Sequence, residues 1–211
     1  MISLACADGV SLEAELRVPD RSSGVDVWAA VVLLHPHPKM GGTMRVGVPS
    51  FLFDALPAAG VAALRFNFRG VEGSGGSHGR GVDERLDVVS AVDALSAAVG
   101  DGVPLVLCGW SFGGDVSLSV SDARVAGWFA VAAPLQVFAD PSAYVAAFDP
   151  RPKVLAVPQH DQYCDPACAR ESTVSWVATS VEVVPGADHF MAGRMDRVAA
   201  MCLSFLEGLR G

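Results

Sequence analysis

An apolar run that leads into a G-x-S-x-G pattern is the feature of this chain that most restricts its fold. The run is Val103–Cys108, and the residues that follow at once are Gly109-Trp110-Ser111-Phe112-Gly113. This order predicts a buried strand, then a sharp turn that raises a serine hydroxyl clear of the sheet, then a helix. Gly109 and Gly113 suit such a turn because a strained strand-to-helix connection leaves no room for Cβ atoms on either side of the serine.

Short apolar runs alternate along the rest of the chain with segments of helical spacing. Several runs are apolar on both faces, which is typical of parallel strands covered by helices on each side. Strands are expected at residues 12–18, 27–34, 61–68, 105–108, 125–132, 154–157 and 181–184, and helices at 49–59, 83–99, 113–121, 166–176 and 191–209. The alternation predicts one α/β domain over residues 1–211, with a single doubly wound, mostly parallel sheet and helices on both faces.

Two segments depart from this regular alternation. In residues 12–18 apolar and polar side chains alternate, which favours an antiparallel edge strand near the N-terminus. Residues 134–152 join two strands without a clear long helix. That segment could form a small lid, but it is too short to be a cap or a second domain.

The charge of the chain excludes some classes of partner. The net charge is −8 and the only lysines are Lys39 and Lys153, whereas nucleic acids and anionic membranes both require a basic surface. No apolar run reaches the roughly 18 residues that a membrane span needs. The N-terminus lacks the pattern of a secretory signal, so a cytoplasmic location is expected.

The five cysteines are odd in number and scattered, and we expect reduced thiols. They are Cys6, Cys108, Cys164, Cys168 and Cys202. Cys164 and Cys168 are close in sequence, but no second pair of ligands completes a zinc site, and no metal is expected.

A serine hydroxyl is a weak nucleophile unless a base takes its proton, and a carboxylate commonly orients that base. Asp161 follows the strand expected at residues 154–157, and His189 follows the one at 181–184. The order Ser…Asp…His is the order in which one known fold arranges such a triad. The sequence therefore predicts Ser111 as nucleophile, His189 as general base and Asp161 as the carboxylate that orients it.

Two other aspartates compete with Asp161. Asp165 precedes Pro166 at the start of an expected helix, which favours a role as N-cap. Asp188 is adjacent to His189, and neighbouring side chains usually point apart. Asp161 has no such capping role and is the preferred candidate, with Asp165 as the alternative.

An oxyanion formed at the serine would need backbone N–H donors. One is expected from Phe112, directly after the nucleophile. The second is expected from the loop at 35–42, where the prolines have no N–H to give. His37 is preferred there by position and Lys39 is the alternative. His35 and His37 could also suggest a metal site, but no third ligand is evident.

Four stretches of the chain carry a resemblance to a known family. They are His35–Met44 (HPHPKMGGTM), Arg65–Gly70 (RFNFRG), Gly109–Gly114 (GWSFGG) and Gly186–Phe190 (GADHF). With them the chain resembles a small, lidless member of the α/β-hydrolase superfamily. It is similar in particular to compact bacterial hydrolases, related to dienelactone hydrolases, that are marked by an H-P-H-P-x-x-G-G-T-M loop.

This resemblance implies the α/β-hydrolase fold without a cap domain and esterase-type hydrolysis of an ester or thioester by a Ser-Asp-His triad. The chain departs from the subgroup at Gln159-His160, where such proteins usually carry a glycine ahead of the acid. Dienelactone hydrolases proper use a cysteine nucleophile, so Ser111 moves the chain away from that activity.

The residues expected around Ser111 are bulky and uncharged, with Lys39 the only expected cation. The expected substrate-binding residues are Met40, Trp110, Phe138, Tyr163 and Phe190. They predict a small to medium, uncharged acyl group on a small-molecule ester or thioester. No cofactor is expected, because the Gly-rich loop at 70–81 has a histidine where a dinucleotide fingerprint requires Gly or Ala. The alternatives are a non-catalytic binding protein on the same scaffold and a cofactor-free perhydrolase side activity.

Overall fold

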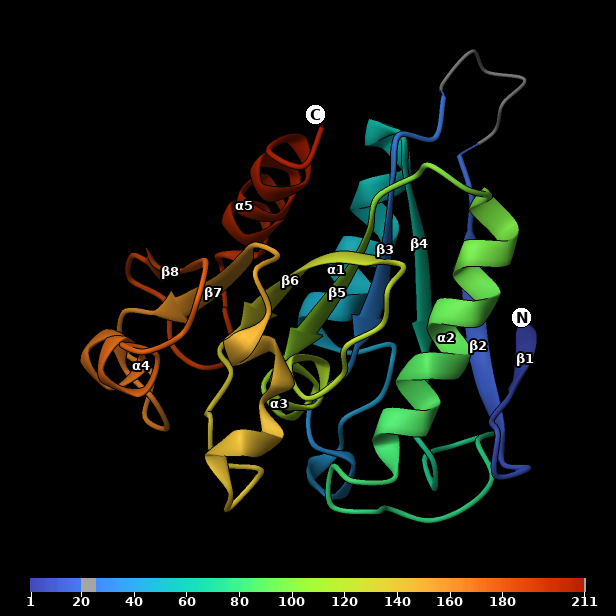
Figure 1. Ribbon diagram of the computed structural model, residues 1–211, viewed down its shortest axis with the longest axis horizontal. Coiled ribbons are helices and arrows are strands. Elements are labelled where there is room, and N and C mark those ends of the chain that lie inside the picture. Colours follow the sequence, from blue (N-terminus) through green and yellow to red (C-terminus); the bar gives the residue numbers. More distant parts are fainter. Residues whose placement is uncertain (20–25, 211) are drawn as a thin grey trace.

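A single sheet of eight strands forms the centre of the molecule. The computed structural model describes residues 1–19 and 26–210. Its strands are β1 (Ile2–Ala5), β2 (Ser11–Arg17), β3 (Ala29–Leu34), β4 (Val61–Phe66), β5 (Leu105–Trp110), β6 (Val125–Val131), β7 (Lys153–Pro158) and β8 (Thr179–Val184). They lie in the order β1-β2-β4-β3-β5-β6-β7-β8 (Figure 1). Strand β2 is antiparallel to both of its neighbours and every other pair is parallel, which confirms the expected sheet.

Helices cover both faces of the sheet and bury a separate apolar core on each. They are α1 (Gly47–Ala55), α2 (Glu84–Val99), α3 (Phe112–Leu118), α4 (Pro166–Ser172) and α5 (Met195–Glu207), with short 3₁₀ helices η2 (Pro38–Met40), η3 (Leu56–Ala59), η4 (Pro141–Ala143) and η5 (Val145–Phe148). Val92 of α2 and Val116 of α3 belong to one core. Leu52 of α1 and Cys202 of α5 belong to the other. In Figure 1, α2 lies in front of the sheet and α1 behind it.

Strand β1 is an element that the sequence did not reveal. It pairs outside β2, so residues 12–18 supply an antiparallel strand, as expected, but not the edge of the sheet. Only Leu4 of its four residues is buried, and one buried side chain gives too little alternation to indicate a strand. The expected helix at 49–59 is divided into α1 and η3, with Pro57 at the start of the second piece. Among the described residues, no helix is both long and apolar enough to cross a membrane.

The topology creates a crevice at the carboxyl ends of β3 and β5. These strands are neighbours, yet the chain runs from β3 outward to β4 and later from β5 outward to β6 on the opposite side. Loops that leave two adjacent parallel strands in opposite directions open a crevice, where ligands commonly bind. The arrowheads of β3, β4 and β5 point to the same end of the sheet in Figure 1. Ser111 and the loop after His35 lie at this end.

The segment 134–152 is anchored to the core by a buried carboxylate. Asp115 of α3 is fully buried and accepts hydrogen bonds of 2.9 Å from the backbone N–H groups of Leu135, Gln136 and Val137. Further along the segment, Tyr144 is buried in the same core. The segment is therefore fixed at its beginning and again at its middle.

Candidate active site

Ser111 occupies a strained turn between β5 and α3. Its backbone has φ 56° and ψ −122°, a conformation that is unfavourable for any residue with a Cβ atom. A Cβ atom on Gly113 would lie 2.6 Å from the carbonyl oxygens of Leu34 and His35. One on Gly109 would overlap the carbonyl of Gly113. Glycine is therefore required on both sides of the serine, as the motif indicates.

Ser111, His189 and Asp161 are connected by hydrogen bonds in that order. Ser111 Oγ lies 2.9 Å from His189 Nε2, and His189 Nδ1 lies 2.8 Å from Asp161 Oδ2. The side chain of Asp161 is only 1% exposed, and that of His189 is 7% exposed. Because the carboxylate accepts, Nδ1 carries the imidazole proton and Nε2 can accept from the serine hydroxyl.

The remaining oxygen of Asp161 is held by its own loop. Oδ1 accepts hydrogen bonds from the N–H groups of Tyr163 at 2.8 Å and Cys164 at 3.3 Å. Two of the acceptor positions of the carboxylate are thus fixed by backbone donors, and the other oxygen is aimed at the imidazole. The edge of the Tyr163 ring also packs on His189, with 4.5 Å between ring centroids.

The competing aspartates have other partners. Asp165 Oδ1 caps α4 by accepting from the N–H groups of Ala167 and Cys168, at 3.0 and 2.9 Å. Asp188 Oδ1 accepts from the N–H of Phe190 at 3.1 Å. Asp161 is the aspartate in contact with the imidazole.

The loop after β3 brings His37 against Phe112. Their rings lie 5.1 Å apart, so the two expected oxyanion donors come from adjacent positions. The N–H of Lys39, the alternative donor, is engaged by Nδ1 of His37 at 3.1 Å. Among the hydrogen bonds of residues 1–19 and 26–210, none uses the backbone N–H of His37 or Phe112 as donor.

His35 joins this loop to the end of β4. Its Nδ1 donates to the carbonyl of Pro36 at 2.7 Å, and its Nε2 accepts from the N–H of Phe68 at 3.0 Å. Burial lowers the pKa of His35 to about 4, so the imidazole is neutral at physiological pH. Both ring nitrogens are engaged by backbone groups, and His35 acts as a structural link.

A cavity of about 260 Å³ opens beside Ser111, and we call it the apolar cavity. Its apolar wall consists of Pro36, Met40, Val46, Trp110, Phe112, Pro134, Val137, Tyr163 and Phe190. Four of the five expected substrate-binding residues therefore lie in it, and Phe138 does not. The Phe138 ring instead packs on Tyr144, at 5.4 Å, and under the guanidinium of Arg85, at 4.7 Å. Val137, whose N–H is held by Asp115, takes the expected place of Phe138 in the wall.

A second cavity of about 320 Å³ adjoins the first, and we call it the Arg80 cavity. It shares five lining residues with the apolar cavity and adds His78, Arg80 and Gln136. Arg80 corrects the expectation that Lys39 is the only cation near the site. No pattern in the sequence indicates this placement, because a loop of twelve residues rich in glycine does not show which of its side chains turns inward.

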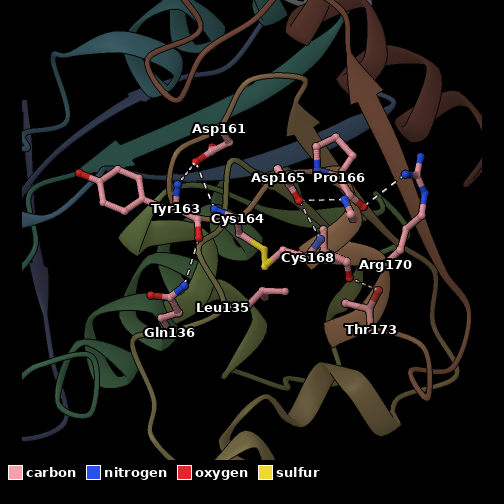
Figure 2. Close-up of a disulfide and its surroundings, with 12 residues drawn as sticks. Leu135, Gln136, Asp161, Tyr163, Cys164, Asp165, Pro166, Cys168, Arg170 and Thr173 are labelled. Carbon is pink, nitrogen blue, oxygen red and sulfur yellow. Dashed lines mark hydrogen bonds between the residues drawn. A yellow bond between two sulfur atoms is a disulfide. The ribbon is translucent and has the colours of Figure 1, made fainter.

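The expectation that all cysteines are reduced is wrong for one pair. Cys164 and Cys168 form a disulfide with 5.3 Å between their Cα atoms (Figure 2). Cys164 precedes the N-cap Asp165, and Cys168 lies in the first turn of α4, so the cap itself brings the sulfur atoms together. The spacing of four residues between the two cysteines, across the Asp165-Pro166 helix start, could have indicated this disulfide. Cys6, Cys108 and Cys202 are free and buried.

Comparison with known proteins places this geometry in context. No protein-family model matches the chain. An alpha-beta serine hydrolase homologue from Coxiella burnetii is 26% identical, with a TM-score of 0.83 over 97% of this chain and 96% of that one. XC6422 from Xanthomonas campestris, a member of the α/β serine hydrolases without a lid, is 23% identical, with a TM-score of 0.83 over 98% and 92% of the two chains. RP471, an uncharacterized protein of Rickettsia prowazekii, is 27% identical over 167 residues, which are 75% of this chain and 70% of that protein.

These similarities, together with the eight-stranded sheet, show that the chain has the lidless α/β-hydrolase fold. The solved structures that it resembles include α/β serine hydrolases.

Proposed function

We propose that this chain is a serine hydrolase of the carboxylesterase type, which cleaves an ester or thioester through an acyl-enzyme intermediate. The observation that carries the proposal is the continuous hydrogen-bonded series from Ser111 Oγ through His189 to the buried Asp161, placed at the wall of an apolar cavity. A serine, a base and an orienting carboxylate in this geometry can together perform nucleophilic acyl transfer.

In the first half of the reaction, Ser111 Oγ attacks the carbonyl carbon of the substrate while His189 Nε2 accepts the hydroxyl proton. The tetrahedral intermediate then collapses. The bond to the leaving group breaks, and His189 returns the proton to the departing alkoxide or thiolate. In the second half, water attacks the acyl-enzyme with His189 again as base, and the acid product and free Ser111 are released.

The carboxylate of Asp161 supports both halves by fixing the imidazole. With Nδ1–H donated to Asp161 Oδ2, Nε2 remains available for the serine proton. The charged imidazolium that forms is stabilised by the adjacent carboxylate. Because Tyr163 and Cys164 hold the other oxygen, the acid does not need to reorient during the reaction.

The negative charge on the carbonyl oxygen requires preorganised donors. We assign this role to the backbone N–H groups of Phe112 and His37. The contact between their rings keeps the two segments adjacent, and His35 fixes the loop that carries His37. Donors of this kind are typically worth about 3 kcal/mol each in the transition state.

The apolar cavity supports a small to medium, uncharged group on one side of the scissile bond. Its described lining contains no Asp, Glu, Lys or Arg side chain. Trp110, Met40 and Phe190 supply large apolar surfaces. Such a wall stabilises an aliphatic or aromatic group through burial and offers nothing to neutralise a charge.

A fluorophosphonate probe tests this function against that of a binding protein on the same scaffold. We expect labelling of the wild type at Ser111 alone, together with hydrolysis of p-nitrophenyl butyrate. The Ser111→Ala variant should lose both while its thermal unfolding remains cooperative. A folded wild type that neither reacts with the probe nor hydrolyses short esters would refute the proposal and favour the binding protein.

A further inference from the structure

The Arg80 cavity contains a charged side chain that the proposed acyl transfer does not use. Arg80 is exposed, and within the described part of the chain its guanidinium forms no hydrogen bond or ion pair. The other described residues of the cavity wall include no carboxylate. In a protein with a net charge of −8, this is a local cationic site in a cavity that shares five lining residues with the apolar cavity at Ser111.

The loop that carries Arg80 is held in its conformation by the buried carboxylate of Glu84. Glu84 is fully buried at the start of α2, and its carboxylate accepts from the N–H of Gly79 at 2.8 Å and from the N–H of Gly81 at 2.7 Å. These two amides flank Arg80. Its backbone is held at φ 56°, in the left-handed region that a residue with a Cβ atom rarely occupies. Such conformations persist only where the surroundings enforce them, and they cluster at ligand sites.

The loop is also fixed against the opposite wall. A Cβ atom on Gly81 would lie 2.7 Å from a methyl group of Val137, so the loop packs tightly on the segment held by Asp115. On the far side of the cavity, Gln136 Nε2 donates to the carbonyl of Tyr163 at 3.1 Å (Figure 2). The cavity wall is thus made of three interlocked segments rather than one free loop.

The chemistry of this wall selects an anion. A guanidinium presents several N–H donors in one plane and binds a carboxylate through two parallel hydrogen bonds. Burial lowers the pKa of His37 below its ordinary value, which disfavours a charged ring there. Arg80 is then the one permanent cation among the described lining residues, and its single charge matches that of one carboxylate.

We propose that the Arg80 cavity binds a carboxylate of the substrate, so that the preferred esters carry an apolar group on one side of the scissile bond and a carboxylate on the other. This inference rests on the proposed hydrolase function and narrows its substrate class. Arg80 is a specificity-determining residue, and the apolar cavity still receives an uncharged group.

Two matched pairs of esters test this substrate class. In the first pair the carboxylate is on the leaving group: 4-carboxyphenyl butyrate is compared with its methyl ester. In the second it is on the acyl group: 4-nitrophenyl hydrogen succinate is compared with 4-nitrophenyl butyrate. The variant is Arg80→Gln. The control is Arg197→Gln, which makes the same charge change at an exposed residue of α5 outside the cavity.

In at least one pair, we expect Arg80→Gln to lower kcat/KM for the carboxylate ester about tenfold, since a charge-assisted hydrogen bond at a solvent-accessible site is lost. The neutral partner should change less than twofold, and Arg197→Gln should leave both members of each pair unchanged. Arg80→Lys should retain part of the preference, because it keeps the charge and loses the bidentate geometry.

Equal effects of Arg80→Gln on the charged and neutral members of both pairs would overturn the inference while leaving the hydrolase function intact. A second readout does not depend on turnover. In the Ser111→Ala background, calorimetry should show about tenfold weaker binding of the preferred carboxylate ester when Arg80 is also replaced by Gln. Unchanged binding in that experiment would equally overturn the inference. Absence of any ester hydrolysis by the wild type would instead refute the proposed function.

Discussion

The hydroxyl of Tyr144 donates a hydrogen bond of 3.0 Å to Oδ2 of Asp115, a buried carboxylate four residues after Ser111. The same carboxylate accepts three backbone N–H groups from residues 135–137, which begin the cavity wall. Burial raises the pKa of Asp115, and the four donors oppose that rise. The helix that begins after Ser111 and the wall of the apolar cavity are therefore joined through one side chain.

Replacing Asp115 by Asn should loosen this wall. The amide group of Asn would direct N–H donors toward backbone N–H groups, so at least one buried donor would lose its acceptor. We expect the free energy of unfolding to fall by about 2–4 kcal/mol. Hydrolysis of short esters should show a raised KM and a smaller change in kcat. Tyr144→Phe is the matched control: it removes one of the four donors and should cost about 1 kcal/mol. Equal losses in the two variants would contradict the central role of the carboxylate.

Exchange of the two neighbouring aspartates distinguishes the acid from the helix cap. Asp161→Asn should lower kcat by a factor on the order of 10³–10⁴, because the amide favours the wrong imidazole tautomer. Asp165→Asn should leave kcat and stability nearly unchanged, since Asn caps a helix about as well as Asp. Steady-state kinetics with p-nitrophenyl butyrate measures both. The reverse result would assign the acid to Asp165.

The neutral, buried imidazole of His35 should make folding stability depend on pH. Its pKa is about 4 in the folded protein, against an ordinary value of 6.5. Between these values the unfolded chain binds more protons, so its population is favoured as the pH falls. The contribution of His35 is complete above pH 6.5, and about 3 kcal/mol of it should be lost by pH 4.

Urea denaturation from pH 7 to pH 4 checks this dependence. His35→Gln should be less stable than the wild type at pH 7 but should lose less stability across the range. His160→Gln removes an exposed histidine and should keep the slope of the wild type. Parallel curves for the wild type and His35→Gln would show that the buried imidazole is not the source of the slope.

A series of p-nitrophenyl esters with lengthening acyl chains should report the volume of the apolar cavity. Each buried methylene contributes about 0.8 kcal/mol, so kcat/KM should rise roughly fourfold per carbon until the cavity of about 260 Å³ is full. Val137→Ala should move the optimum to a longer chain. Phe138→Ala, which changes a ring that packs on Tyr144 and does not line this cavity, should leave the optimum in place. A flat profile in the wild type would contradict an apolar subsite.

The parts of the structure that could be predicted from the sequence are those set by local patterns. Ser111 stands in a motif whose glycines are sterically required. Asp161 and His189 each follow a predicted strand, and the carboxyl ends of parallel strands meet at one edge of a sheet. The contacts among the three side chains follow from that topology.

The parts that could not be predicted depend on the orientation of side chains in loops. Val137 rather than Phe138 faces the apolar cavity because Asp115, on another element, fixes the backbone there. Arg80 faces its cavity because Glu84 captures the amides on both sides of it. Neither orientation follows from a periodic pattern in the sequence, because each depends on hydrogen bonds between a loop and a buried carboxylate of another element.

The left-handed backbone at Ser111 lowers folding stability at the position where the proposed chemistry needs a side chain. At φ 56° and ψ −122° a Cβ atom lowers the free energy of unfolding by about 1–3 kcal/mol, and a glycine at this position would restore part of that stability. Ser111→Gly and Ser111→Ala both lack the hydroxyl and differ only in that Cβ atom. Chemical denaturation should therefore find the glycine variant more stable than the alanine variant by about 1 kcal/mol, after the greater entropy of unfolded glycine is counted. Selection for stability alone would favour glycine at position 111, whereas the acyl transfer proposed above requires the serine hydroxyl at the same position.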